Sequence, residues 1–170
     1  AFHIVPANIP INFLYSFVFG FLSGNSNVIR MSSKLYRQSE IAIKILNNLF
    51  NLKKYKNLRL MNSFIQYDHD TSITDEISKN CNARIIWGGD KTINKITQSK
   101  ISHRAKELKF PDRYSVALIN SNKIMRDSKL KIYNLAKNFF NDTYLVDQNA
   151  CSSPHIIFWT GNHIAKAKKI

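Results

Sequence analysis

Cys151 is the side chain of this sequence best suited to covalent chemistry. It lies in a polar segment, Asp147 to Pro154, between a predicted helix and a predicted strand. A thiolate on such a turn can attack a thioester or an aldehyde and hold the acyl group covalently, close to backbone N–H donors. A small buried hydrophobic side chain is the alternative, and the local sequence does not decide between the two. Cys81 has no catalytic pattern beside it, and we expect it to be structural.

Asn8 is a second candidate, placed between Pro6 and Pro10 at a predicted strand-to-helix turn. The NH2 group of its side chain can point into a cleft and donate to a developing oxyanion. An asparagine between two prolines is also a common turn residue, and for Asn8 considered alone this is the simpler interpretation.

The end of one predicted strand carries residues that suit a phosphate group. Arg30 belongs to the predicted strand Asn27–Met31, and Ser32 and Ser33 follow it directly. Open α/β sheets bind ligands at the carboxyl ends of their strands, so a cation and two hydroxyls there suit a phosphorylated ribose.

The segment Trp87-Gly88-Gly89-Asp90 ends a further predicted strand, Arg84–Trp87. Glycines let the backbone approach a pyrophosphate, and the N-terminus of the helix that Asp90 is expected to cap attracts it. A Gly-Gly pair is a weak signal and is not the GxGxxG fingerprint. Asp68-His69-Asp70 offers three metal-ligating side chains, but adjacent residues seldom converge on one ion, so we expect a helix-capping loop and no metal.

Alternating strands and helices position these candidates. Strands are predicted at Phe2–Val5, Asn27–Met31, Leu58–Tyr67 and Arg84–Trp87, and helices at Pro10–Leu22, Tyr36–Phe50, Asp70–Asn80 and from Asp90 through Ile101. Pro10 suits a first helical position, and Ser72-x-x-Asp75 resembles a capping box. This alternation predicts βαβ units and an α/β fold with a mainly parallel sheet. Beyond Pro111-Asp112 the chain has predicted strands at Tyr114–Ile119 and His155–Trp159 around a helix at Leu130–Phe140.

The composition limits the classes of protein to be considered. The 170 residues are 44% hydrophobic, which excludes a disordered tail because such a chain can bury a core. The net charge of +14 favours anionic partners, which are nucleic acid, an acidic membrane or a phosphate-rich cofactor. The most apolar run, Ile11–Leu22, is too short to cross a bilayer. Two cysteines make no disulfide framework, which favours the cytoplasm, and the start at Ala1 suggests a fragment.

Five stretches of the sequence together resemble one family. They are HIVPANIP (3–10), GNSNVIRMSSK (24–34), IIWGGDKTI (85–93), KFPDRYSVALIN (109–120) and DQNACSSPH (147–155). In this order they resemble the LuxC-type long-chain acyl-CoA reductases of the aldehyde dehydrogenase superfamily. The resemblance implies a Rossmann-like, mainly parallel sheet, with a cofactor-binding domain at residues 1–106 and the beginning of the catalytic domain at residues 107–170.

The resemblance also implies a role for each candidate. Cys151 matches the nucleophile, which takes the acyl group from the CoA thioester, and Asn8 matches the oxyanion donor that works with the backbone N–H of Cys151. Arg30 stands where the superfamily usually has a lysine at the adenosine ribose, and Ser33 where many NAD-preferring members have a glutamate. Cofactor contacts are expected for the remaining candidates, which are Pro6, Ala7, Ser32, Trp87, Gly88, Gly89 and Asp90.

Two positions depart from the superfamily pattern. Lys109 replaces the glutamate base of hydrolytic aldehyde dehydrogenases, which suits an enzyme that passes its acyl group to hydride rather than to water. Tyr67-Asp68-His69-Asp70 replaces a glycine-bearing loop near the adenine.

The expected function is therefore NADPH-dependent reduction of a long-chain acyl-CoA to the aldehyde through an acyl-cysteine. The alternatives are a CoA-independent aldehyde dehydrogenase and, from another class, a basic nucleic-acid-binding domain. The expected partners are acyl-CoA or an acyl-protein and further subunits, identical or different. We expect no nucleic acid, no membrane span and no metal.

Overall fold

The protein forms two compact units, Ala1–Asp112 and Arg113–Ile170, each described here by itself. The structure, a computed structural model, describes residues 1–6, 8–34, 36–68 and 70–170. Ala7 and His69, both named as candidates above, lie outside the described residues.

The first unit is built around a five-stranded sheet in the order β3-β2-β1-β4-β5, with every pair of neighbouring strands parallel. Its strands are β1 (Phe2–Ile4), β2 (Asn27–Met31), β3 (Asn62–Gln66), β4 (Ala83–Gly88) and β5 (Lys106–Pro111). Its helices are α1 (Asn12–Leu22), α2 (Arg37–Phe50), α3 (Lys56–Met61), α4 (Thr71–Asn80) and α5 (Asp90–Ile96), with a 3-10 turn, η1 (Lys53–Tyr55). The predicted α/β fold with a mainly parallel sheet is confirmed.

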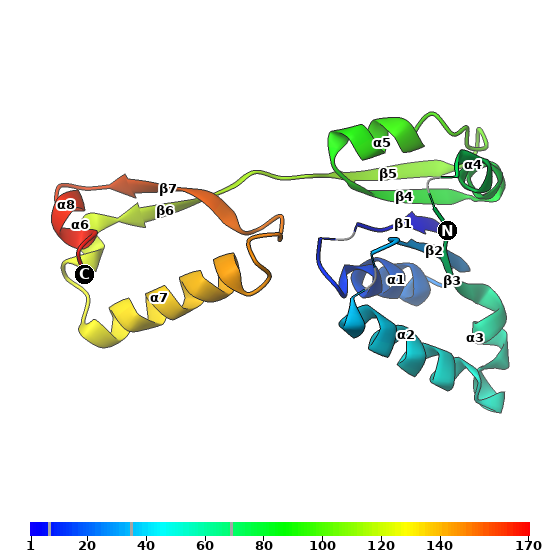
Figure 1. Ribbon diagram of the computed structural model, residues 1–170, viewed down its shortest axis with the longest axis horizontal. Helices are drawn as coiled ribbons and strands as arrows, with labels where there is room; N and C mark the ends of the chain where they lie inside the picture. The colour runs from blue at the N-terminus through cyan, green and yellow to red at the C-terminus, as the bar shows by residue number, and fades with distance from the viewer. Residues whose placement is uncertain (7, 35, 69) are drawn as a thin grey trace. The chain divides into compact units, whose positions relative to one another are not determined.

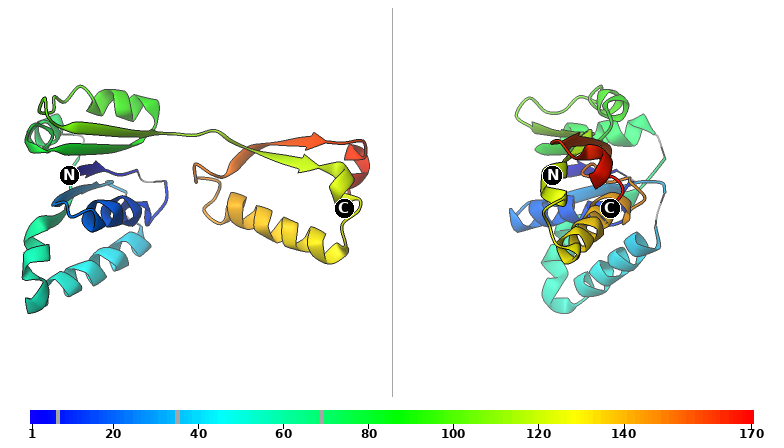
Figure 2. Two further views of the ribbon diagram at one scale, coloured as in Figure 1. Left: turned by 180° about the vertical axis from the view of Figure 1, so that it is seen from behind. Right: turned by 90° about the vertical axis from the view of Figure 1, so that its left-hand side faces the viewer.

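Helices cover both faces of this sheet (Figure 1). Alternate strand residues therefore enter two separate cores, one under α1 and α2 around Ile29 and Met31, the other under α4 and α5 around Ile4 and Ile86. Figure 2 shows the same layers from behind. Burial on both faces explains why five of the eight residues of β1 and β2 are apolar, while the buried polar residues His3 and Asn27 are hydrogen-bonded to each other.

Several predicted boundaries in the first unit were wrong. Pro10 precedes α1 instead of starting it, because the helix begins at Asn12. The first half of the predicted strand Leu58–Tyr67 is α3, and β3 begins only at Asn62. Residues 58–61 are apolar enough for either element, and a short apolar run does not separate a strand from a helix.

Helix ends also differ from the predictions. Asp70 caps α4 by accepting a hydrogen bond from the Ser72 N–H at 2.8 Å, so the cap lies two residues before the predicted capping box. Gly89 is the N-cap of α5, and Asp90 is its first residue, not its cap. The helix ends at Ile96, short of the predicted Ile101.

Strand β5 was missed, because its sequence KELKFP carries three charges and has no apolar run. It is an edge strand of the sheet, where charged side chains are well tolerated. Since β5 pairs with β4, the first compact unit includes β5 and extends to Asp112.

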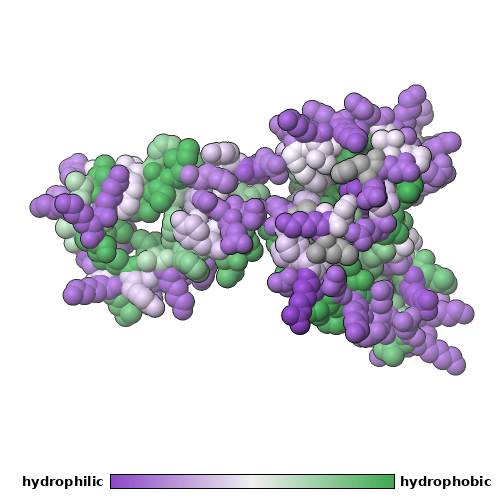
Figure 3. Space-filling view, viewed as in Figure 1, coloured by the Kyte–Doolittle hydropathy of each residue, from purple (hydrophilic) through white to green (hydrophobic). Residues whose placement is uncertain are grey.

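The second unit contains two parallel strands, β6 (Ser115–Asn120) and β7 (Pro154–Thr160), connected through α6 (Ser121–Ile124) and α7 (Lys129–Tyr144) and followed by α8 (Ile164–Ala167). The two predicted strands and the predicted long helix are confirmed. Val116 and Leu118 pair with Ile156 and Phe158, so the four side chains share one face, which is exposed. Figure 3 shows hydrophobic side chains at the surface of both units.

Candidate functional site

The candidate cofactor residues follow the carboxyl ends of neighbouring strands in the first unit. Pro6 and Asn8 follow β1, Ser32 follows β2, and Gly89 follows β4. Parallel neighbours bring these ends to one edge of the sheet, the edge at which open α/β sheets bind ligands.

Arg30 lines a cavity of about 260 Å3 near this edge, between α4 and α5. Two further cations, Lys91 and Lys95, line it as well. The Arg30 Nη2 donates to the Tyr67 carbonyl at 3.3 Å, and the guanidinium carbon lies 5.0 Å from the centroid of the Tyr67 ring. The arginine is thereby held at the cavity, where its charge and those of the two lysines suit an anionic group.

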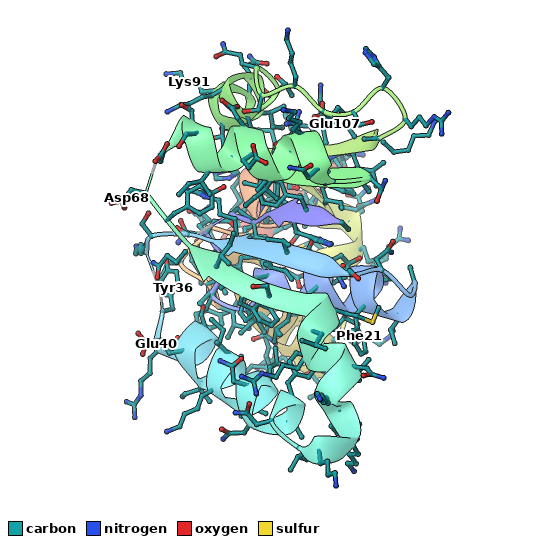
Figure 4. All side chains as sticks on the ribbon, turned by 90° about the vertical axis from the view of Figure 1, so that its right-hand side faces the viewer. Phe21, Tyr36, Glu40, Asp68, Lys91 and Glu107 are labelled. Atoms are coloured by element: carbon teal, nitrogen blue, oxygen red, sulfur yellow. The ribbon has the colours of Figure 1, made fainter. Side chains whose placement is uncertain are left out.

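Lys91 and Lys95 were not among the sequence candidates, although a signal for them exists. Lys91 directly follows Gly88-Gly89-Asp90, and Lys95 lies four residues further along α5, so both share one face of that helix. Two carboxylates line the cavity as well, Asp68 and Asp70, so its lining carries three cations against two acids. The remaining lining residues are hydroxyl-bearing or apolar: Ile4, Thr71, Thr74, Thr92, Ile96 and Ser99. Figure 4 shows Lys91 and Asp68 toward one edge of the unit, with Glu107 toward the other.

Ser32 and Ser33 do not line this cavity. Ser32 lines a narrow crevice with Pro6, and Ser33 is exposed. The Gln66 side-chain Nε2 donates to both serine carbonyls at 3.1 Å, which ties the segment after β2 to the end of β3. The hydroxyl of Ser33 consequently stands on a fixed backbone.

Trp87 lies on the opposite face of the sheet from Arg30. Its ring stacks on Phe110 with centroids 4.1 Å apart, and its Nε1 donates to the Ser16 hydroxyl at 3.1 Å. It lines an apolar groove of about 420 Å3 that also includes Tyr15 and Phe19 of α1. The cofactor contact expected for Trp87 stays a prediction, as do those of Gly88, Gly89 and Asp90.

A buried hydrogen-bond chain continues from Ser16 through His3. The Asn27 side-chain amide donates to Asn62 at 2.8 Å, so its carbonyl oxygen, 3.0 Å from the His3 Nε2, must accept from that nitrogen. Neutral His3 then accepts at Nδ1 from the Ser16 hydroxyl, 2.8 Å away. Burial lowers the pKa of His3 below its ordinary value of 6.5, which favours this neutral form.

Lys109 is held in an ion pair. Its Nζ lies 3.1 Å from the Oε1 of Glu107, whose Oε2 accepts from the Nε of buried Arg84 at 2.7 Å. Burial alone would raise the pKa of Glu107, but hydrogen bonds from Arg84 and Lys109 hold it below the usual 4.5. Position 109 therefore carries a paired cation.

Cys151 is exposed and lies in the loop that leads from α7 to β7 in the second unit (Figure 1). The Ser153 N–H donates to the Ala150 carbonyl at 3.0 Å, which makes Cys151 the second residue of a hydrogen-bonded β-turn. The Ser115 hydroxyl donates to the Cys151 carbonyl at 2.7 Å. The thiol is thus presented on a fixed turn, as a nucleophile requires.

Both ends of the loop are tied to the unit. The buried hydroxyl of Ser153 donates to the carbonyl of Asp142 on α7 at 2.9 Å. The Gln148 side chain donates to the Pro154 carbonyl, the first of β7, at 3.1 Å. Asn8 belongs to the first unit and Cys151 to the second, and their joint action stays a prediction.

Over the described residues, no group of three His, Cys, Asp or Glu side chains is arranged to hold a metal ion. Within the same ranges, no helix combines the length and the apolar character needed to span a bilayer.

A family model described as "Acyl-CoA reductase (LuxC)" matches residues 1–168. The chain belongs to this family. The LuxC relatives include the long-chain acyl-protein thioester reductase of Vibrio harveyi, 23% identical over 98% of this chain and 33% of its own length. The corresponding reductase 2 of Photobacterium leiognathi is 26% identical over 95% of this chain and 32% of its own length. The chain thus spans about a third of the curated relatives that it matches.

Solved structures show which fold this LuxC chain adopts. A lactaldehyde dehydrogenase superposes with a TM-score of 0.72 at 14% identity, over 99% of this chain and 33% of that protein. PnpE, solved in complex with nicotinamide adenine dinucleotide, gives the same TM-score and identity over 99% of this chain and 32% of its own. The predicted Rossmann-like sheet of the aldehyde dehydrogenase type is confirmed.

Proposed function

We propose that this chain contributes the cofactor site and the nucleophile of a reductase that converts a long-chain acyl thioester to the aldehyde. The observation that carries the proposal is the exposed Cys151 on a tied turn, in a chain that belongs to the LuxC family. Residues 1–106 would belong to the cofactor-binding domain, and residues 107–170 would begin the catalytic domain.

The proposed reaction starts at the sulfur of Cys151. Its thiolate attacks the thioester carbonyl carbon, and the oxygen becomes an oxyanion that the Asn8 amide and the Cys151 backbone N–H stabilise. The C–S bond to the leaving thiol breaks, which leaves an acyl-cysteine on Cys151. A nicotinamide cofactor, when bound, supplies the hydride that reduces this acyl group. Release of the aldehyde returns the sulfur to a thiolate.

The residues of the first unit fit such a cofactor. Arg30, Lys91 and Lys95 surround one cavity at the ligand-binding edge of the sheet, which matches the charge of nucleotide phosphates. The NAD bound by PnpE supports a nicotinamide cofactor, since that protein has the same fold. We propose NADPH, because Arg30 can meet a ribose phosphate and the segment from Arg30 to Arg37 contains no carboxylate to repel it. Asp68 and Asp70 line the same cavity, where Arg30, Lys91 and Lys95 outnumber them.

Lys109 supports reduction over the CoA-independent aldehyde dehydrogenase activity. A paired ammonium group cannot take a proton from an attacking water, so the acyl-cysteine would persist until the acyl group is reduced. The nucleic-acid alternative rests on net charge alone.

The donor of the acyl group would be acyl-CoA or an acyl-protein, since the two relatives named above are acyl-protein thioester reductases. Assembly with identical or different subunits and a cytoplasmic location are part of the same proposal.

Labelling of the complete protein with radioactive acyl-CoA in the absence of cofactor tests the proposal. Wild-type protein should become acylated, and Cys151→Ser protein should lose labelling as a thioester. Cys81→Ser is the matched control, because its thiol is half-buried, donates to the Ser78 carbonyl at 3.2 Å and should not react. Equal thioester labelling of Cys151→Ser and wild-type protein would exclude Cys151 as the nucleophile.

A further inference from the structure

The backbone of the nucleophile is held by a residue far away in sequence. Ser115 is the first residue of β6, 36 positions before Cys151, and its hydroxyl donates to the Cys151 carbonyl at 2.7 Å. This bond fixes the plane of the peptide that follows Cys151. The rest of the turn is closed by the bond from Ser153 to Ala150.

Such a turn leaves a backbone donor in place for chemistry. The closing bond of a β-turn uses the first carbonyl and the fourth N–H, so the N–H of the second residue stays available. Cys151 is that second residue, and its N–H donates to no acceptor among the described residues. This is the backbone N–H that the proposed mechanism uses for the oxyanion.

The strand pairing places Ser115 where it can reach the turn. Ser115 pairs with Pro154 but Val116 pairs with Ile156, so His155 is an extra residue in β7 and the ladder has an irregularity at this point. Irregularities of this kind often re-aim a side chain next to an active site. Here it lies beside the bond that Ser115 makes to Cys151.

The approach to Cys151 is conformationally costly. Asp147 and Gln148 have φ values of 51° and 62°, the left-handed region, which non-glycine residues adopt at a cost. Gln148 offsets part of this cost by donating from its side chain to the Pro154 carbonyl at 3.1 Å. A strained backbone persists only where surrounding bonds determine it, and here the Asp147 and Gln148 N–H groups donate to the Tyr144 and Thr143 carbonyls, both at 3.1 Å.

We propose that Ser115 is a positioning residue: its hydroxyl holds the carbonyl of Cys151, and thereby keeps the turn in the conformation in which the Cys151 N–H, on the preceding peptide, meets the oxyanion during acyl transfer. The proposal rests on the proposed function of Cys151. Ser115 touches neither substrate nor cofactor in this role, and it acts only through the backbone of Cys151. Its removal should therefore slow oxyanion-forming chemistry while leaving the thiol itself reactive.

The test compares two reactions of Cys151 in the complete protein. Acylation by a long-chain acyl-CoA passes through an oxyanion, whereas alkylation by iodoacetamide displaces iodide and forms none. Ser115→Val and Ser115→Thr are nearly equal in shape and differ in the hydroxyl, so their difference isolates the hydrogen bond. Ser128→Ala, which removes the N-cap hydroxyl of α7, controls for a general loss of stability in the same unit.

We expect Ser115→Val to lower the single-turnover acylation rate at saturating acyl-CoA by about 10- to 100-fold, the range for a displaced donor. The acyl-CoA concentration that gives half-saturation and the rate of alkylation should both stay within about twofold of the wild-type values. Ser115→Thr should recover most of the acylation rate. Ser128→Ala should leave both rates near wild type.

Unchanged acylation in Ser115→Val would overturn the positioning role. An equal fall in acylation and alkylation would overturn it too, since that outcome indicates a structural role only. Cys151→Ser is run in parallel: thioester labelling of that variant would contradict the proposed function itself, whatever the Ser115 variants do.

Discussion

The two units bury their hydrophobic side chains to different extents. Phe2, Ile29 and Ile86 of the first unit are fully buried, in a sheet covered by helices on both faces. In the second unit the buried apolar side chains are Ile124, Pro154 and Ala167, while Leu118 is 72% exposed. A parallel sheet is normally covered on both faces, so the first unit has the packing of an independent fold and the second does not.

This difference separates the two halves of the proposed site. The first half is the cofactor edge, which is the edge of the sheet where β1, β2 and β4 end. These strand ends are anchored by a hydrophobic core, and the proposed binding of the cofactor phosphates there depends mainly on charge. The Cys151 turn rests instead on side-chain-to-backbone hydrogen bonds from Ser115, Gln148 and Ser153. Changes in packing should therefore affect the first unit most, and loss of single hydroxyls the second.

The largest difference between the two units is expected when a hydrophobic side chain is truncated, because the resulting loss of unfolding free energy depends on how deeply that side chain is buried. Ile86→Ala should reduce the free energy of unfolding of the first unit by about 2–5 kcal/mol, because it removes buried methyl groups and leaves a cavity. Leu118→Ala in the second unit should cost less than about 0.5 kcal/mol, since that side chain is exposed. Urea titration followed by fluorescence measures both, because Trp87 reports on the first unit and Trp159 on the second. Similar losses at both positions would contradict the comparison.

The two units should also differ in how much stability is lost when an ion pair is removed. Glu107→Gln leaves Arg84, only 1% exposed, without its counter-charge and should cost the first unit about 3 kcal/mol at pH 7. The folded pKa of Glu107 is lowered, so its stabilisation is present above about pH 4.5 and is lost as the pH falls through the folded pKa. Asp127→Asn removes the Lys123–Asp127 pair of the second unit and should cost at most about 0.5 kcal/mol. Urea titrations at pH 7 and at pH 4 distinguish the two pairs.

The parts of this protein that follow a local pattern were predictable from its sequence. β2 was predicted with its observed bounds, because Val28, Ile29 and Met31 mark a short buried strand that begins soon after Gly24-Asn25. β5 was missed because an edge strand needs no such run. The position of Cys151 in a loop between α7 and β7 was also predicted, but its bond from Ser115 was not, since local spacing cannot show a contact across 36 residues.

The cofactor edge shows a similar division. Arg30 was predicted as a cofactor residue because it lies near the end of a predictable strand. Lys91 and Lys95, which line the same cavity, were not predicted, although their four-residue spacing can be seen in the sequence. Alternation along β4 turns Trp87 to the face opposite Arg30, which the sequence did not indicate, and its cofactor contact stays a prediction. Which face a side chain takes depends on the register of the sheet, which the sequence alone left open.

A charge introduced at the cofactor edge should affect cofactor binding alone. We expect Ser33→Glu to weaken NADPH binding at least about tenfold more than NADH binding, because the carboxylate repels the ribose phosphate. Ser33→Gln, of similar size and neutral, should weaken the two equally. Dissociation constants measured on the complete protein decide this, and equal losses with Ser33→Glu would place the phosphate elsewhere. Alkylation of Cys151 should not change in either variant.

The smallest effect concerns pH and the buried His3. Because burial lowers its folded pKa below 6.5, the unfolded chain binds a proton more readily than the folded one. The contribution of His3 to stability is therefore complete above about pH 6.5 and falls as the pH drops toward the folded pKa, by at most about 1.4 kcal/mol per pH unit.

Urea titrations at pH 7.5, 6.5 and 5.5, followed at Trp87, measure this decrease. The exposed residue His155 of the second unit provides the control: His155→Gln should leave the pH dependence of the first unit unchanged. His3→Gln should weaken the unit at every pH, since it disrupts the chain from Ser16 to Asn27, but it should flatten the decrease. If the free energy of unfolding of His3→Gln protein still decreases between pH 7.5 and 5.5, another group causes the decrease. Protonation of His3 would then not explain the loss of stability of the first unit in acid.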